Sequence, residues 1–279
     1  MPAVFLKDRS FIRVAGTEVE AFLHNLITTD LASLATNEVR PGALLTPQGK
    51  ILFDFMIRRD GPGFLIETDA TQQEGLLKRL TMYRLRAKID FSVDDVQGVT
   101  VAWAAEAGEG PRDSRFLKAD IALTRTPGQH GHDAEALYDE LRIASGIAVS
   151  GRDFALQDAF PHDVMMDING GLGFRKGCYI GQEVVSRMHH RGTARRRVVI
   201  VDGTMDLPVS GTELTAGGKP MGSLGSIAGR KGLAVIRIDR AGEAIATGTP
   251  ILAGEVEVSV SLPTWSGLTF PAPADEASA

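Results

Sequence analysis

Residues 175–187 have the sequence Arg-Lys-Gly-Cys-Tyr-Ile-Gly-Gln-Glu-Val-Val-Ser-Arg, and they include Cys178, the only cysteine among the 279 residues. Two cations precede this cysteine, and nearby positive charge favours the reactive thiolate over the thiol. A helix that begins after Gly181 would add the positive end of its dipole, although Gln182 to Val185 fit a strand equally well. The alternative is a buried structural cysteine, the common environment of a free thiol. We predict a reactive thiol.

The eight residues from Lys176 to Glu183 resemble the signature of the YgfZ-type tetrahydrofolate-binding proteins, which are relatives of the glycine-cleavage T-protein, an aminomethyltransferase. The match is uninterrupted. The resemblance implies a protein that uses tetrahydrofolate, or a one-carbon derivative of it, in the synthesis, maintenance or repair of iron–sulfur enzymes. It also implies that Lys176 and Cys178 are the catalytic residues. The other residues of this signature motif are Gly177, Tyr179, Gly181, Gln182 and Glu183.

Glycine occupies two positions beside the cysteine. At Gly177 and Gly181 the backbone can turn without the steric penalty of a Cβ atom. We therefore predict that both glycines shape the loop around the thiol.

The composition is that of a soluble globular protein, since 43% of the residues are hydrophobic and 23% are charged. No apolar run approaches the roughly 18 residues that a membrane-spanning helix needs, and the first residues lack the pattern of a secretory signal. One cysteine excludes an internal disulfide and is compatible with a reducing compartment. These features predict a cytoplasmic protein without a membrane partner.

The same counts disfavour three other kinds of site. An iron–sulfur cluster is usually held by about four thiolates, so a chain with one cysteine cannot hold a cluster alone. The net charge of −5 argues against broad affinity for nucleic acid. The spacing of His162, Asp163 and Asp167 matches no defined set of metal ligands, so we predict no metal site.

The first part of the chain predicts an α+β arrangement of strand, helix, hairpin, helix and strands. Thr17 with Glu20, and Thr71 with Glu74, have the spacing of capping boxes, which mark helix starts. The predicted strands are 11–14, 51–58, 64–67, 88–93 and 99–104, and the predicted helices are 18–26 and 71–85.

The resemblance extends over this part of the chain. Leu26 to Asp30, Gly49 with Lys50, and Tyr83 to Lys88 fall where the family has a helix end, a Gly-Lys turn and a basic helix terminus. In the strand after this turn, the T-protein has two adjacent aspartates, one of them catalytic. This chain has Phe53 and Asp54 there. Because an aromatic residue replaces one carboxylate, aminomethyltransferase activity of the T-protein kind is not expected.

Three residues are predicted to bind the folate: Lys50, Asp54 and Arg187. Lys50 would line the wall of the folate channel, or it would be a hairpin-tip lysine in water. Asp54 is costly to bury between two phenylalanines unless another group pairs with it. Arg187 opens a run to residue 197 with five arginines and two histidines. Guanidinium groups match the carboxylates of a folate polyglutamate tail, while a solvated linker and an RNA contact are the alternatives. The run contains no aromatic residue that would stack on bases.

The second part of the chain predicts one clear helix at 134–145, stopped by Gly146, and then short strands that suit a small barrel or sandwich. With the resemblance, the predicted fold class is α+β, in a three-lobed T-protein-like architecture with a C-terminal all-β barrel. The predicted domains are an α+β folate-binding lobe (1–95), a second α+β lobe with the signature (96–197), the β-barrel (198–270) and a disordered tail (271–279).

Three functions remain open. The signature favours a tetrahydrofolate-binding accessory protein whose partners are folate and iron–sulfur enzymes or their assembly factors. A folate-dependent aminomethyl- or methyltransferase is the first alternative, so a transferase-like activity stays open. The second alternative is a partner in RNA modification that works through the arginine run.

Overall fold

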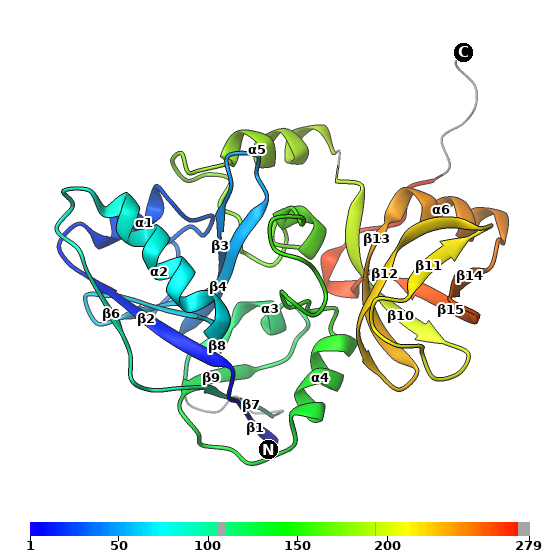
Figure 1. Ribbon diagram of the computed structural model, residues 1–279, viewed down its shortest axis with the longest axis horizontal. Coiled ribbons are helices and arrows are strands. Elements are labelled where there is room, and N and C mark those ends of the chain that lie inside the picture. The colour runs from blue at the N-terminus through cyan, green and yellow to red at the C-terminus, as the bar shows by residue number, and fades with distance from the viewer. Residues whose placement is uncertain (105–109, 193, 273–279) are drawn as a thin grey trace. The chain divides into compact units, whose positions relative to one another are not determined.

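The computed structural model describes residues 1–104, 110–192 and 194–272 (Figure 1). They form two compact units. The first contains residues 1–138, 156–161 and 166–190, and the second contains 139–155, 162–165 and the described residues from Arg191 on. The signature motif lies in the first unit. The domain boundaries predicted after residues 95 and 197 stay predictions, and the predicted tail lies, from residue 273 on, outside the described residues.

The helices and strands of the first unit follow the predicted α+β order. They are β1 (Ala3–Leu6), β2 (Arg9–Ala15), α1 (Val19–His24), β3 (Glu38–Leu45), β4 (Ile51–Asp60), β5 (Gly63–Asp69), α2 (Ala70–Arg84), β6 (Asp90–Val93), β7 (Val99–Trp103), β8 (Arg112–Asp113), α3 (Ser114–Leu117), β9 (Leu123–Pro127) and nearly all of α5 (Gln182–Arg191). Two elements include residues of both units: α4 (Glu135–Ala144) and the 3-10 helix η1 (Pro161–Val164).

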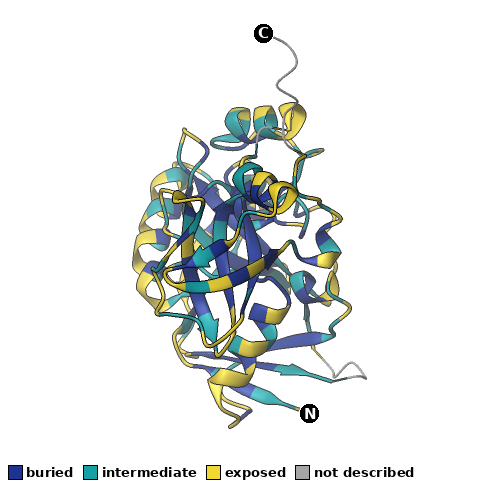
Figure 2. Cartoon of the chain, turned by 90° about the vertical axis from the view of Figure 1, so that its right-hand side faces the viewer, coloured by how far each residue is buried: buried dark blue, intermediate teal, exposed yellow. Residues whose placement is uncertain are grey.

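The strands of the first unit form one nine-stranded sheet in the order β1-β7-β9-β8-β3-β4-β5-β2-β6. Neighbouring strands are antiparallel except β3 and β8, which are parallel. Helix α2 packs against β2 and β5, and its Leu76 and Leu80 join the buried core of the unit. The buried residues concentrate on the strands, as the dark blue segments of Figure 2 show. Burial of this apolar face stabilises the sheet.

A chain of largely buried ion pairs links strands of this sheet, including β5 and β9, which are not neighbours. Glu67 of β5 accepts hydrogen bonds from Arg125 of β9 at 2.5 and 2.9 Å and from Arg9 of β2 at 2.7 Å. Arg125 also contacts Asp113 at 3.3 Å. Burial alone would raise the pKa of Glu67, but the charges of Arg125 and Arg9 outweigh it and lower that pKa to about 2. The carboxylate therefore stays ionised inside the unit.

Both predicted capping boxes are wrong. The N-cap of α1 is Glu18, without a side-chain hydrogen bond, and Glu20 instead pairs with Arg59 at 3.2 Å. Helix α2 is capped by Asp69, whose carboxylate accepts the N–H of Thr71 at 2.8 Å. Aspartate is among the best N-cap residues, and strand β5 ends directly on it, so the helix begins earlier than the threonine pattern predicts.

The second unit contains the predicted barrel. Its six strands close in the order β10-β13-β12-β11-β14-β15, and alternate side chains such as Val199, Val201, Ala234 and Ile236 form its core. The α+β class and the C-terminal barrel are thus confirmed. The elements are β10 (Arg196–Gly203), β11 (Glu213–Ala216), β12 (Lys219–Ala228), β13 (Lys231–Arg237), α6 (Ile238–Thr247), β14 (Ile251–Ala253), β15 (Val256–Ser261) and the 3-10 helix η2 (Thr264–Ser266).

Helix α6 was not predicted from the sequence. It packs against β11, β12 and β13 through the buried residues Ala241 and Ala244. Its Gly242 leaves room for the chain that returns over it, since a Cβ atom there would lie 2.1 Å from the carbonyl oxygen of Pro271. Glycine has a low helix propensity, and the buried positions of α6 are mostly occupied by alanine and glycine instead of large apolar residues, which hides this helix in the sequence.

A second buried polar cluster lies in the second unit around Arg142 of α4. Its side chain is fully buried and donates to Asp139 at 2.8 Å, to Asp153 at 2.8 Å and to Ser226 at 2.5 Å. Asp153 also accepts the N–H of Ser226 at 2.7 Å. The cluster therefore ties the end of α4, the loop that contains Asp153, and strand β12 together.

Candidate functional site

The segment after α1 forms one side of the candidate site. The N–H of Thr28 donates to the carbonyl of Ala43 in β3 at 2.9 Å, and the Thr28 hydroxyl oxygen accepts the N–H of Ala43 at 2.9 Å. The hydroxyl of Thr29 donates to the carbonyl of Pro41 at 2.9 Å. Both threonines are fully buried. Their side chains thus fasten the segment to β3, and its main-chain carbonyls remain for other partners.

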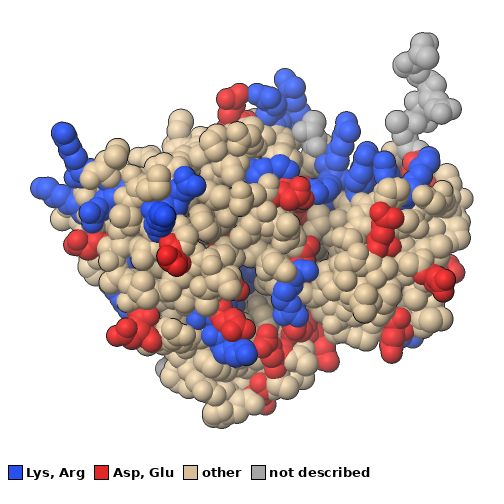
Figure 3. Space-filling model, in the orientation of Figure 1, with Lys and Arg blue, Asp and Glu red and all other residues tan. Residues whose placement is uncertain are grey.

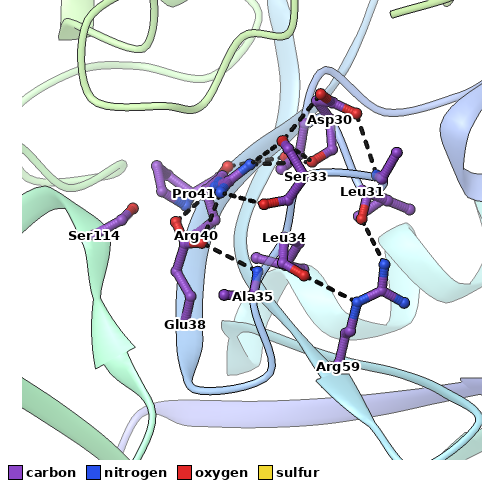
Figure 4. Close-up of polar contacts among 12 residues, drawn as sticks. Asp30, Leu31, Ser33, Leu34, Ala35, Glu38, Arg40, Pro41, Arg59 and Ser114 are labelled. Atoms are coloured by element: carbon purple, nitrogen blue, oxygen red, sulfur yellow. Dashed lines mark hydrogen bonds and ion pairs between the residues drawn. The ribbon is translucent and has the colours of Figure 1, made fainter.

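Two arginines fix the loop that follows, residues 30–37 (Figure 4). Arg40 donates to the carbonyl of Asp30 at 3.1 Å, and Arg59 donates to the carbonyl of Leu31 at 2.8 Å. Guanidinium groups make several such bonds at once because their donors are held in one plane. The main chain beside the threonines is therefore held in one conformation.

The signature motif binds to this segment through Lys176. Its ammonium group donates to the carbonyls of Ile27 and Thr29, at 2.6 and 2.9 Å. The N–H of Gly173 donates to the carbonyl of Thr28 between them, at 2.8 Å. Burial lowers the pKa of Lys176 to about 8, although the charge of Asp30 acts in the opposite direction. A group with a pKa near neutrality can hold or release a proton under physiological conditions.

The loop continues past a histidine to the exposed thiol. Gly177 donates its N–H to Nε2 of His24, the last residue of α1, at 3.3 Å. Burial, followed by the charge of Lys176, lowers the pKa of His24, while Asp30 and Glu20 act in the opposite direction. His24 is a site residue that the sequence analysis missed. Cys178 is exposed, which excludes the alternative of a buried structural cysteine.

Helix α5 begins directly after the motif glycine, so the helix is confirmed over the strand. Gly181 has φ +78°, and a Cβ atom on it would lie 2.5 Å from the carbonyl oxygen of Thr46. Gly49 in the β3–β4 turn has φ +79°, and its Cβ would lie 2.9 Å from Cβ of Val184. The turn and the start of α5 thus approach each other backbone to backbone, which only glycine permits.

The same argument was wrong for Gly177. Its backbone is not in the left-handed region, and a Cβ atom there would make an ordinary contact with His24 at 3.9 Å. The turn next to the thiol therefore depends on Gly181 alone.

The remaining motif residues have separate places. The N–H of Tyr179 donates to the side-chain oxygen of Gln182 at 3.3 Å, and the N–H of Gln182 donates to the carbonyl of Tyr179 at 3.2 Å. Burial raises the pKa of Tyr179 to about 12, so the phenol stays protonated. Its ring centroid lies 5.1 Å from Nζ of Lys176. Glu183 is exposed and pairs with Arg187 at 2.7 Å.

The three predicted folate-binding residues each have a different partner. That of Arg187 is Glu183, as described above. Lys50 donates to the carbonyl of Asp158, and its Nζ lies 3.8 Å from the ring centroid of Phe160. It is therefore not the hairpin-tip lysine in water that the alternative described. Asp54 is partly buried and accepts a hydrogen bond from Gln72 at 3.2 Å, which supplies the pairing that its burial requires.

The arginine run is divided between exposed and structural positions. In the second unit, Arg196 pairs with Asp163 at 2.8 Å, and the buried Arg197 donates to the carbonyl of His162 at 2.7 Å. These two guanidinium groups hold the chain near η1 against β10. Two of the five arginines thus have partners within the fold, which weakens the RNA alternative.

The structure adds two findings on other kinds of site. Across residues 1–104, 110–192 and 194–272, no three His, Cys, Asp or Glu side chains are grouped to hold a metal ion. Over the same ranges, every helix is too short or too polar to cross a membrane.

Lys176 predicts a pH dependence of stability. In the unfolded chain it has an ordinary pKa of 10.5 and binds a proton up to that pH, whereas the folded state releases the proton near pH 8. Folding stability should therefore rise with pH between these values, by about 1–2 kcal/mol after allowance for solvent screening. Denaturant titrations across this range should show the rise in the wild type and lose it in Lys176→Met. The same slope in both proteins would contradict the assignment.

Known proteins resemble the chain over most of its length. Residues 195–268 match the family model of the CAF17 C-terminal beta-barrel domain. The human mitochondrial iron–sulfur cluster assembly factor IBA57 is 29% identical, and the alignment covers 93% of this chain and 84% of the relative. The mitochondrial IBA57 homologue of Coccidioides immitis is 28% identical, with 94% and 82% covered. That of Pyricularia oryzae is 33% identical over 70% of this chain, which spans 55%, about half, of that relative's length.

One of these findings corrects the predicted location. The relatives named here are mitochondrial proteins, so the prediction of a cytoplasmic protein is contradicted. The composition and the single cysteine indicate a reducing compartment, but they do not distinguish one such compartment from another.

The fold is that of the T-protein. The crystal structure of the glycine cleavage system aminomethyltransferase T from Bartonella henselae superimposes with a TM-score of 0.67 at 16% identity, and the match covers 94% of this chain and 85% of that chain. At this identity the likeness concerns the fold alone. The chain thus has the aminomethyltransferase fold with a C-terminal barrel that matches the CAF17 barrel model, and the relatives named here are IBA57 iron–sulfur cluster assembly factors. The predicted relation to the YgfZ type stays a prediction.

Proposed function

We propose that this protein is an accessory factor in the assembly or maintenance of iron–sulfur enzymes, and that it acts through the signature motif with a reduced folate. The observation that supports the role most is the similarity to iron–sulfur cluster assembly factors over more than nine-tenths of the chain. The motif is the natural site, because it combines an exposed thiol with a lysine whose pKa is lowered to about 8.

The signature motif combines a lysine that is held by hydrogen bonds with a cysteine that is exposed. Lys176 is held by the carbonyls of Ile27 and Thr29, and it can hold or release a proton at Nζ two residues before the thiol. Cys178 is exposed in a loop and is free to react as a nucleophile or to act as a single metal ligand at the surface. A cluster itself would be cargo supplied by another protein, since one thiol cannot hold it.

The exposed arginines that precede and follow the thiol in the sequence fit the acidic part of a folate. Arg175 and Arg187 are exposed, and the present partner of Arg187 is a solvent-exposed glutamate that a competing carboxylate can displace. Lys50 fits less well, because it would have to leave Asp158 and Phe160. When bound, a reduced folate would supply a one-carbon acceptor. The chain's own contribution would be to bind the glutamate tail through these arginines.

Titration with folates tests this part of the proposal. Tetrahydrofolate with a polyglutamate tail should bind more tightly than the monoglutamate, and the difference should shrink with salt because exposed charges are screened. The double variant Arg175→Gln, Arg187→Gln should show a smaller difference at low salt. Equal affinities of both folates for the wild type at every ionic strength would remove the arginines from the site.

Activity of iron–sulfur enzymes in cells that lack the protein tests the role itself. Wild type should restore that activity, and Lys176→Met should not, because the lysine both anchors the motif and carries its titratable proton. We expect Cys178→Ala to lose most of the restoration. Met205→Ala, an exposed apolar residue of the second unit, is the control and should restore fully. Full restoration by both motif variants would show that the motif is only a structural turn.

A further inference from the structure

The chain makes a strained turn where α2 ends. The N–H of Ala87 donates to the carbonyl of Arg84 at 2.8 Å, which closes a four-residue turn. Leu85 has φ 47° and ψ −107°, close to the first central position of a type II′ turn, where glycine dominates. A leucine therefore occupies a backbone conformation that disfavours every side chain with a Cβ atom.

This leucine is also the most exposed large hydrophobic residue in the described part of the chain. Its exposed fraction is 87%, and that of Met82 on the preceding helical turn is 59%. The base of the turn is anchored to the fold, since Lys88 donates its N–H to Glu18 at 2.7 Å and Ile89 is buried. Leu85 thus projects from a fixed support and buries almost no apolar surface in the fold.

Positive charge surrounds the two apolar side chains. The flanking cations are Lys78, Arg79, Arg84, Arg86 and Lys88. Among the described contacts, none of the five is in an ion pair, and Arg84 contacts only the carbonyl of Ile89, at 3.3 Å. Figure 3 shows Lys and Arg gathered over this end of α2, at the upper left. The chain as a whole has a net charge of −5, so this surface has the opposite sign to the rest of the chain.

We propose that this surface, the α2 tip formed by Met82, Leu85 and the five cations, docks an acidic protein partner that receives Leu85 in an apolar pocket. Backbone strain persists where a function uses it, and no contact within the fold accounts for a leucine here. Arginine pairs well with carboxylates, and an apolar anchor within a charged rim is the usual anatomy of a protein interface. The inference does not depend on the proposed function or on the motif.

The α2 tip suits protein better than other anionic partners. A single-stranded nucleic acid would be expected to stack its bases on exposed aromatic rings, and the one aromatic residue at the tip, Tyr83, is half-buried. A lipid surface takes a whole apolar helix face, whereas only Met82 and Leu85 are exposed large apolar residues here.

Binding to three probes tests the proposal with the full chain. The probes are a pool of short peptides in which leucine or phenylalanine is flanked by glutamates, vesicles that contain phosphatidylserine, and a single-stranded RNA. The peptide pool should bind, and binding should weaken with salt. Leu85→Gly should bind the peptides about tenfold more weakly and should be at least as resistant to denaturant as the wild type, because glycine relieves the turn. Arg84→Glu with Arg86→Glu should abolish binding.

The control is Val209→Gly, which removes a side chain of similar exposure in the second unit and should change nothing in peptide binding. Three results would overturn the proposal: no binding of the peptide pool, equal peptide binding by the wild type and Leu85→Gly, or tighter binding to vesicles or RNA that depends on the same residues. A loss of stability in Leu85→Gly would also overturn it, since the leucine would then have a structural role.

Discussion

Replacement of Arg142 by methionine should lower the free energy of unfolding of the second unit by about 3–5 kcal/mol. The guanidinium is fully buried and contacts Asp139, Asp153 and Ser226. Methionine has a similar length but no donor, so Asp153 would remain buried without its counter-charge. Removal of one partner from a buried pair is costly because the other charge is left uncompensated in a medium of low dielectric constant.

Arg152→Met is the matched control. Arg152 pairs with the same Asp139 at 2.7 Å, but its side chain is 47% exposed, so its loss should cost about 0–1 kcal/mol. Denaturant unfolding can be followed in a Trp103→Phe background by the fluorescence of Trp265. The indole of Trp265 donates to the carbonyl of Ser145 at 2.8 Å in the same unit. Equal costs for the two arginines would contradict the buried network.

Gly181→Ala should lower the free energy of unfolding of the first unit by about 2–4 kcal/mol. Part of the cost is the left-handed backbone, with φ +78°. The rest is steric, because the new Cβ would lie 2.5 Å from the carbonyl oxygen of Thr46. Main chain cannot move aside as cheaply as the end of a side chain, so the β3–β4 turn would be forced away from α5.

Gly61→Ala separates the two contributions. Gly61 also has a positive φ, +53°, but nothing lies within 4 Å of a Cβ atom there. Its substitution should therefore cost only the backbone preference, about 1–2 kcal/mol. The measurement is the free energy of unfolding of the two variants, with Trp103 as the fluorescent reporter of the first unit. If Gly181→Ala costs no more than Gly61→Ala, the close backbone contact does not exist.

The elements that the sequence predicts well are those with a local pattern. The β4–β5 hairpin, helix α4 and the barrel strands have alternation or helical periodicity within a few residues. Helix α6 has an apolar face at helical spacing, but alanine and Gly242 occupy most of its buried positions, and the central glycine indicates a break in a helix, so the helix was missed. The start of α2 was misplaced because Asp69 caps it, while the threonine pattern two residues later matches a capping box equally well.

The candidate site was predictable only in part. The octapeptide marked the segment on which the proposed site rests, and its charged, glycine-rich surrounding suggested an accessible thiol, which Cys178 is. The hydrogen-bond partners of Lys176 were not predictable. They are the carbonyls of Ile27 and Thr29, and every residue type has a carbonyl. His24 likewise lies 153 residues before Gly177 in the chain, and no local pattern marks it as a neighbour.

The two hydrogen bonds of Lys176 also determine when a newly synthesised chain can complete this part of its fold. Their two acceptors precede the lysine by 149 and 147 residues, and a ribosome adding about 5–20 residues per second needs on the order of ten seconds to cover that distance. Throughout that interval α1, β3 and β4 are available to fold, but the carbonyls after α1 await their cation. A nascent chain interrupted before Gly173 would therefore leave these carbonyls hydrogen-bonded to water. Such an incompletely folded chain is a natural substrate for chaperones and proteases.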